Sequence, residues 1–235
     1  MSKKINLKEW DSIEKLKNNF FSIICFASRK SGKSELIKCI YEQCNFGDEY
    51  DHVIVMSECM DTLDFFSNFV HGNLFFNEFS SNYIQNIISQ SEKLEFENNK
   101  KKFLLIIDDV VGNTIKYSEV MQRIYAVGRH YRISCILICQ KLTLINTAVR
   151  NNSDLILIGR SKTAQEKKSI IENLLDGVID KNDIKNYGMS TKDEFYNTLL
   201  KEHTSDYNFI VLDFLDQKNI EFDEVVKTYK AKLSQ

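Results

Sequence analysis

Short apolar runs alternate along the chain with longer segments in which apolar and polar residues are mixed. This alternation is typical of a parallel β-sheet covered by helices. The apolar runs are rich in Val, Ile and Leu with few polar interruptions, as expected for strands that are buried on both faces. We predict such strands at Phe21–Ala27, His52–Met56, Phe103–Asp108, Ser134–Cys139 and Leu155–Gly159.

The mixed segments predict the covering helices. They lie at Lys33–Cys44, Ser80–Glu97, Tyr117–His130, Ala164–Leu175 and Lys192–Glu202. Near the end of the chain, Phe209–Phe214 is expected to form an edge strand and Glu221–Lys232 a closing helix. The fold class predicted is therefore α/β, with a mostly parallel central sheet flanked by helices on both faces. We expect an N-terminal extension over residues 1–19 and one domain over residues 20–235, of which residues 160–235 form a C-terminal part with helices and an edge strand.

Composition and charge narrow the class of protein. The chain has 235 residues, of which 43% are hydrophobic and 27% charged, an ordinary globular balance. No apolar run reaches about 18 residues, and the first residues lack the apolar core of a signal peptide, so we expect an intracellular protein with no membrane span. The net charge of −2 disfavours a protein that grips nucleic acid tightly by itself. The six cysteines include no Cys-x-x-Cys pair, and we expect Cys25 and Cys135 to be core residues.

The first candidate motif joins the first predicted strand to the first predicted helix. Residues 27–34 read A-S-R-K-S-G-K-S, which fits the phosphate-binding P-loop G-x-x-x-x-G-K-[ST] except at its first glycine. In that loop backbone N–H groups cradle phosphates, Lys33 reaches the β- and γ-phosphates, and Ser34 holds Mg²⁺. Alanine is tolerated at position 27 if its φ stays negative. The nucleotide-binding residues predicted are Ala27, Ser28, Arg29, Lys30, Ser31, Gly32, Lys33, Ser34 and Glu35.

Arg29 and Lys30 leave two alternatives open. They add positive charge near the phosphates, or they point to solvent.

The second motif is a pair of carboxylates after an apolar strand, F-L-L-I-I-D-D-V at Phe103–Val110. This is the Walker B arrangement, in which Asp108 supports the Mg²⁺ shell together with Ser34. Asp109 is then available to orient or deprotonate an attacking water, as a hydrolase requires. The alternative is a turn that closes the strand. GTP specificity is disfavoured, because the guanine-reading N-K-x-D pattern is absent.

The third candidate group surrounds the strand predicted at Ser134–Cys139. Gln140 follows this strand, and ligands gather at the carboxyl ends of strands in open α/β sheets. Gln140 is therefore a candidate for sensing the γ-phosphate or aligning the water. Arg129 precedes the strand, in G-R-H-Y-R. It is either an arginine finger that acts on a neighbouring subunit's nucleotide or a cation that complements a helix C-terminus.

The segments SGKS, FLLIIDDV and GRHYRISCILICQ, in this order, resemble the poxvirus-type genome-packaging ATPases of the FtsK–HerA clade, found in large DNA viruses and virophages. The resemblance covers Phe20 to about Gly159 and is weaker beyond. It implies a P-loop NTPase of the ASCE type, in which the sensor strand lies between the P-loop and Walker B strands. It also implies an ATP-hydrolysing motor that moves double-stranded DNA into a preformed capsid.

By position, the resemblance makes Lys33, Asp109, Gln140 and Arg129 catalytic, with Arg129 acting across a subunit interface. Asp109 stands where the wider clade commonly has a longer glutamate. ATP and Mg²⁺ are the implied cofactors, with Ser34 and Asp108 as the residues that hold the metal.

The implied partners are double-stranded DNA, contacted transiently through loops, and capsid or virion proteins. The loop Val111–Tyr117, with Lys116, is a candidate DNA contact or a solvated surface loop. A homo-oligomeric ring located in the virion and the host-cell cytoplasm is implied as well.

Two other functions stay open at this point. A small-molecule kinase of the P-loop class would need an arginine-rich lid, for which the later part of the chain offers only Arg150 and Arg160. A non-catalytic, nucleotide-dependent adaptor of virion assembly would bind ATP without turnover. The full set of Lys33, Asp108, Asp109 and Gln140 argues against the adaptor.

Overall fold

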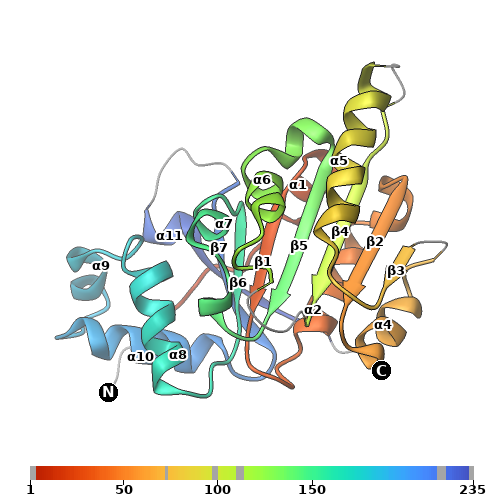
Figure 1. Ribbon diagram of the computed structural model, residues 1–235. Helices are drawn as coiled ribbons and strands as arrows, with labels where there is room; N and C mark the ends of the chain where they lie inside the picture. The colour runs from red at the N-terminus through yellow and green to blue at the C-terminus, as the bar shows by residue number, and fades with distance from the viewer. Residues whose placement is uncertain (1–3, 72–73, 97–99, 110–113, 216–220, 233–235) are drawn as a thin grey trace.

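The computed structural model describes residues 4–71, 74–96, 100–109, 114–215 and 221–232. An eight-stranded sheet with the order β3-β2-β4-β5-β1-β6-β7-β8 forms its centre (Figure 1). The strands are β1 (Ser22–Phe26), β2 (His52–Ser57), β3 (Leu74–Phe76), β4 (Phe103–Asp108), β5 (Ile133–Cys139), β6 (Leu155–Ile158), β7 (Asn208–Asp213) and β8 (Val226–Lys230).

The strands from β3 to β6 in this order are parallel, and β7 and β8 are antiparallel to their neighbours. All five strands predicted from apolar runs are present, so the mostly parallel α/β sheet is confirmed. β5 lies between the P-loop strand β1 and the Walker B strand β4, as the resemblance implies. The carboxyl ends of β1, β4 and β5 therefore meet at one edge of the sheet.

Helices cover both faces of the sheet (Figure 1). Alternate residues of β1 separate two cores: Ile24 and Phe26 face the core that includes α5 and α6, whereas Ile23 and Cys25 face the core that includes α2. The α-helices of the described residues are α1 (Ile13–Asn18), α2 (Lys33–Gln43), α3 (Phe46–Glu49), α4 (Met60–Ser67), α5 (Ser81–Phe96), α6 (Glu119–Val127), α7 (Thr147–Asn151), α8 (Ala164–Ile170), α9 (Lys181–Asn186), α10 (Lys192–His203) and α11 (Phe222–Val225).

The predicted helix at Glu221–Lys232 is wrong. Only α11 is helical there, and the chain continues as β8, which pairs with β7 from Leu212↔Val226 to Asn208↔Lys230. As a result β7 lies between β6 and β8 and is not the edge strand that its sequence predicts. Val226, Thr228 and Tyr229 favour extended backbone, and pairing with β7 outweighs the helical spacing of the apolar residues.

Other boundaries shift by a few residues. The helix predicted at Tyr117–His130 begins at Glu119, because the Ser118 side chain accepts a hydrogen bond from the Met121 backbone N–H. It ends at Val127 and is followed by a 3₁₀ turn over Gly128–Tyr131. The short elements α1, α3, α4, α7, α9 and β3 have no counterpart among the predicted elements.

The N-terminal segment lies along the outer side of β8. Glu9 forms a parallel bridge with Thr228, and the Trp10 backbone N–H donates to the Thr228 carbonyl. Trp10 is 2% exposed. Its indole N–H donates to Asp213 Oδ2 at 3.1 Å, and its ring meets Tyr229 edge to face. No helix among the described residues has both the length and the apolar character needed to cross a bilayer.

Candidate active site

The P-loop leaves β1 at the carboxyl edge of the sheet and leads directly into α2. Lys30 and Gly32 adopt left-handed backbone, with φ of 59° and 83°. Left-handed residues that alternate with right-handed ones turn successive N–H groups toward a common centre, which forms an anion-binding nest. Gly32 is also the N-cap of α2 and supplies no side-chain cap, so the first N–H groups of the helix face the same space.

The alanine at the first P-loop position fits because a glycine lies opposite it. Ala27 is fully buried and is not among the residues with positive φ, which meets the condition for alanine at this turn. A β-carbon added to Gly159 would come within 2.8 Å of Ala27 Cβ and 2.5 Å of Phe209 Cε1. Gly159 thus leaves room for the Ala27 methyl group beside the P-loop strand.

Lys33 points back into its own loop. Its side chain is buried, and Nζ donates to the Ser28 carbonyl oxygen at 3.2 Å. The Ser31 hydroxyl donates to the same carbonyl oxygen at 2.6 Å. The ammonium group therefore lies inside the ring of loop backbone, within reach of phosphate oxygens held by that ring.

Asp108 lies at the end of β4, facing the start of α2. Its Oδ2 accepts a hydrogen bond from Ser34 Oγ at 3.3 Å, whereas its Oδ1 is buried without a hydrogen-bond partner among the described residues. Burial, and after it the negative charge of Asp109, raises the pKa of the Asp108 carboxyl from 3.8 to about 7. A buried carboxylate oxygen without a partner, beside a hydroxyl group, is a donor set that fits Mg²⁺, which prefers oxygen ligands.

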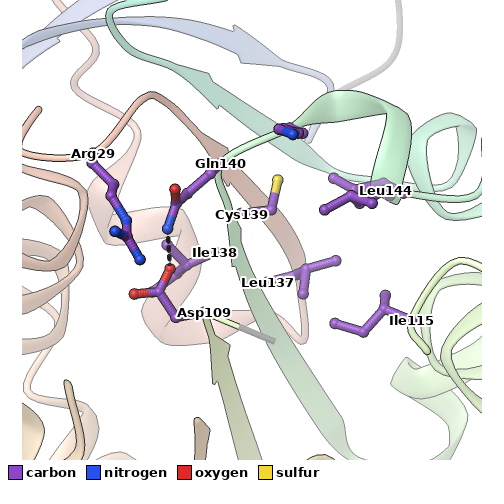
Figure 2. A pocket seen from close by; sticks show the side chains of 10 residues that line it. Arg29, Asp109, Ile115, Leu137, Ile138, Cys139, Gln140 and Leu144 are labelled. Carbon is purple, nitrogen blue, oxygen red and sulfur yellow. Dashed lines mark hydrogen bonds between the residues drawn. The ribbon is translucent and has the colours of Figure 1, made fainter. Parts of the chain in front are cut away.

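Asp109 and Gln140 meet between the ends of β4 and β5. Gln140 Nε2 donates to Asp109 Oδ1 at 2.6 Å. Asp109 has left-handed backbone with φ of 49°, an unusual state for a residue other than glycine, and this turns its side chain toward Gln140. Figure 2 shows the Arg29 side chain extending from the P-loop toward the Asp109 carboxylate. The side chains of Arg29, Asp109 and Gln140 thus converge from three separate segments.

A cavity of about 300 Å³ connects these groups. The P-loop from Arg29 to Glu35 lines it together with Asp108, Asp109 and Gln140. Three residues of α4, for which no role is predicted from the sequence, complete the lining: Asp61, Thr62 and Phe65. The signal that could have found them is topological, because α4 follows the carboxyl end of β2 at the same edge of the sheet.

Arg129 is not brought to this site. It lies exposed in the 3₁₀ turn that precedes β5, at the amino end of that strand, whereas Gln140 follows the carboxyl end. β5 runs from Ile133 to Cys139, so the two edges of the sheet are roughly 20 Å apart. Arg129 cannot reach the nucleotide of its own chain in this fold.

The predicted DNA loop is described only in part. Val111 to Asn113 lie outside the described residues. Lys116 is partly exposed, and its ammonium group lies 5.8 Å from the centre of the Tyr117 ring. Tyr117 itself is 70% exposed. A cation and an aromatic ring are therefore presented together on the surface.

Solved structures of other proteins share this fold. The DNA-packaging ATPase B204 from Sulfolobus Turreted Icosahedral Virus superposes with a TM-score of 0.61 at 17% identity, over 92% of this chain and all of B204 (100%). The conjugation coupling protein TcpA of pCW3 superposes with a TM-score of 0.59 at 13% identity, over 98% of this chain and 71% of TcpA. At these identities the likeness establishes a P-loop ATPase fold.

Sequence comparison adds the family. The uncharacterized protein 088R of Invertebrate iridescent virus 3 is 22% identical over 202 residues, which cover 86% of this chain and 72% of that protein. Residues 9–186 match the family described as poxvirus A32 protein. The matched region contains the P-loop, the paired aspartates, β5 and Gln140. The chain belongs to the poxvirus A32 protein family.

Proposed function

We propose that this chain is an ATPase that drives double-stranded viral DNA into a preformed capsid. The observation that carries the proposal is the convergence of Lys33, Ser34, Asp108, Asp109 and Gln140 around one cavity at the carboxyl edge of the sheet. Membership of the A32 family and the fold shared with the packaging ATPase B204 support it. The chain is a genome-packaging ATPase with one ATPase domain over residues 20–235 and an extension over residues 1–19.

In this proposal the P-loop binds the phosphates of ATP. The backbone N–H groups of residues 27–35 and the start of α2 receive phosphate oxygens, and Lys33 exchanges its bond to the Ser28 carbonyl for the β- and γ-phosphates. The Ser34 hydroxyl and the Asp108 carboxylate would hold Mg²⁺, which neutralises charge on these two phosphates.

Asp109 and Gln140 carry out the hydrolytic step in this proposal. The bond between them fixes the carboxylate beside the space that a terminal phosphate would enter, where it orients the attacking water and takes up its proton. Arg29 points toward the same place, so its guanidinium stabilises the negative charge of the transition state from within the chain. A kinase has no need of a water-activating carboxylate in this position.

The surroundings of Arg150 also disfavour the alternative function, a small-molecule kinase with an arginine-rich lid. Arg150 donates to the carbonyl oxygens of Leu142 and Ile145, and to the side chains of Thr147 and Asn173. These bonds tie the Arg150 side chain to its own helix, α7, and to the segments beside it. It therefore cannot move over a bound phosphate as a lid residue does. Arg160 alone does not make an arginine-rich lid.

The partners in this proposal follow from the motor function. Chains assemble into a ring in which Arg129 of one copy reaches the nucleotide of the next. DNA passes the loop that contains Lys116 and Tyr117, and capsid or virion proteins anchor the ring. The protein acts in the host-cell cytoplasm and in the virion.

An ATPase assay with and without double-stranded DNA tests the proposal. We expect DNA-stimulated hydrolysis that falls about 100-fold or more in Lys33→Ala and in Asp109→Asn, because each removes a group that acts on the phosphates or the water. Lys201→Ala, on the exposed surface of α10, is the matched control and should keep full activity. Wild-type turnover in Asp109→Asn would remove the role assigned to this carboxylate. Phosphorylation of nucleosides without DNA stimulation would favour a kinase, and ATP binding without turnover an adaptor.

A further inference from the structure

We propose that the ring of Tyr207 is the platform on which the nucleobase of the bound nucleotide stacks. This inference deepens the proposed function and rests on it, since it names the group that receives the other end of the same ligand. Tyr207 lies beyond residues 9–186, the part of the chain that matches the family.

Sheet topology brings Tyr207 to the P-loop from nearly 180 residues away in sequence. Tyr207 directly precedes β7, which is antiparallel to β6 with Ile210 opposite Ile158. The start of β7 therefore lies at the carboxyl end of β6, on the edge of the sheet from which the P-loop emerges. In the order β4-β5-β1-β6-β7, Tyr207 and the Asp109–Gln140 pair lie on opposite sides of the P-loop strand.

The ring of Tyr207 touches the glycine of the P-loop. A β-carbon added to Gly32 would come within 2.4 Å of Tyr207 Cδ1 and 3.2 Å of Cε1. The residue nevertheless remains 40% exposed, one of the large hydrophobic side chains that the described surface leaves open. One part of the ring thus rests on the loop that cradles phosphates, while the rest is open to a ligand.

The backbone holds this ring in place at a cost. Asp206 and Tyr207 both adopt left-handed backbone, with φ of 51° and 61°, which is strained for residues other than glycine. Hydrogen bonds fix the turn: the Asn208 N–H donates to the Ser205 carbonyl at 2.9 Å, and the Ala231 N–H to the Tyr207 carbonyl at 3.0 Å. A glycine would make the same turn without strain. The turn therefore does not explain why position 207 carries an aromatic side chain.

The direction of a bound nucleotide supplies that explanation. Its terminal phosphate must lie beside Asp109 and Gln140, and the phosphates next to it lie over Gly32 and the start of α2. The base then lies on the far side of the loop, toward β6 and β7, where Tyr207 presents its ring. Stacking on an aromatic side chain strengthens the binding of one base about 10- to 100-fold.

Binding of two ligands separates this role from a structural one. ADP carries a base, whereas inorganic tripolyphosphate carries phosphates alone, and both are measured by calorimetry on the full chain. Tyr207→Asn removes the ring but keeps a residue that tolerates left-handed backbone, and Tyr207→Phe keeps the ring. We expect Tyr207→Asn to weaken ADP about 10- to 100-fold while tripolyphosphate stays within about twofold of wild type, and Tyr207→Phe to bind both normally.

Each other outcome overturns the inference. An equal loss of both ligands in Tyr207→Asn, at an unchanged melting temperature, would mean that the ring only shapes the P-loop. Unchanged ADP binding would mean that the base does not touch the ring, while the ATPase proposal would stand if wild type still hydrolyses ATP. If wild type binds neither ligand, both the ATPase proposal and the inference fail.

Discussion

Asp108 combines burial with an oxygen that lacks a hydrogen-bond partner among the described residues. Its pKa is raised to about 7, above the ordinary value of 3.8, so the folded protein binds more protons than the unfolded chain between about pH 4 and pH 7. The free energy of unfolding contributed by this group therefore falls as the pH rises through that window. Above pH 7 the ionised carboxylate destabilises the protein until a cation or nucleotide complex binds.

Replacing this carboxylate should stabilise the nucleotide-free protein while abolishing its activity. At pH 8, without nucleotide or divalent cation, we expect Asp108→Asn to raise the melting temperature by several degrees, because a neutral amide carries no buried charge. At pH 5 the gap should shrink, since the wild-type carboxyl is then protonated. Scanning calorimetry at the two pH values, with an ATPase assay alongside, measures this. An equal gap at both pH values would contradict the pKa of Asp108.

At the scale of elements, the N-terminal segment covers one edge of the sheet. Unpaired edge strands invite pairing with other chains, and here residues 8–10 occupy the outer side of β8. Trp10 fixes this arrangement through Asp213 and Tyr229, while Lys227 forms an ion pair with Asp213 at 3.3 Å. The stability of β8 therefore depends on a side chain that precedes the P-loop.

Trp10→Ala should destabilise the protein by about 3–5 kcal/mol, because it empties a buried aromatic site and removes a donor to Asp213. Trp10→Phe refills most of the volume without the indole N–H and should cost less than half as much. Urea unfolding followed by far-ultraviolet circular dichroism measures both variants. A cost below about 1 kcal/mol for Trp10→Ala would show that the segment does not stabilise the edge.

Elements differ in how far their sequence predicts them. The buried parallel strands carry continuous apolar runs, and these locate β1, β2, β4, β5 and β6 correctly. β8 is short and half polar, with Lys227 and Lys230 beside Val226 and Tyr229, so its local pattern also suits a helix end. Its extended state comes from pairing with β7 and with residues 8–10, which local periodicity does not contain.

The site also combines residues that local sequence patterns locate with a residue that only distant contacts locate. Asp108, Asp109 and Gln140 could be placed together from sequence, because the carboxyl ends of adjacent parallel strands meet at one edge. Tyr207 could not, since it reaches that edge through an antiparallel strand whose position depends on distant contacts. Its sequence neighbourhood carries no phosphate-binding pattern.

At the scale of the whole molecule, Arg129 and the P-loop lie on opposite edges of the sheet. A role for Arg129 in hydrolysis therefore requires a second copy whose amino-end edge faces the first copy's nucleotide. In a closed ring built from head-to-tail contacts, each copy presents two different surfaces to its neighbours, and this allows the two edges to meet.

Mixing two inactive variants tests this arrangement. Arg129→Ala supplies an intact P-loop, and Lys33→Ala supplies an intact arginine. In a random equal mixture about a quarter of the interfaces would combine both intact groups, so about a quarter of the wild-type ATPase rate should return. No recovery, with assembly verified by light scattering, would exclude Arg129 as a group that acts on its neighbour.

The bridge between Glu9 and Thr228 also sets an order of events during synthesis. Residues 8–10 are synthesised before the P-loop strand, but their pairing partner in β8 is made more than 200 positions later. Until then the indole of Trp10 has neither Asp213 nor Tyr229 to contact, while the P-loop strand and its helix are already available for packing. Pairing of residues 8–10 with β8 therefore closes this edge of the sheet only after β1 to β7 have been synthesised.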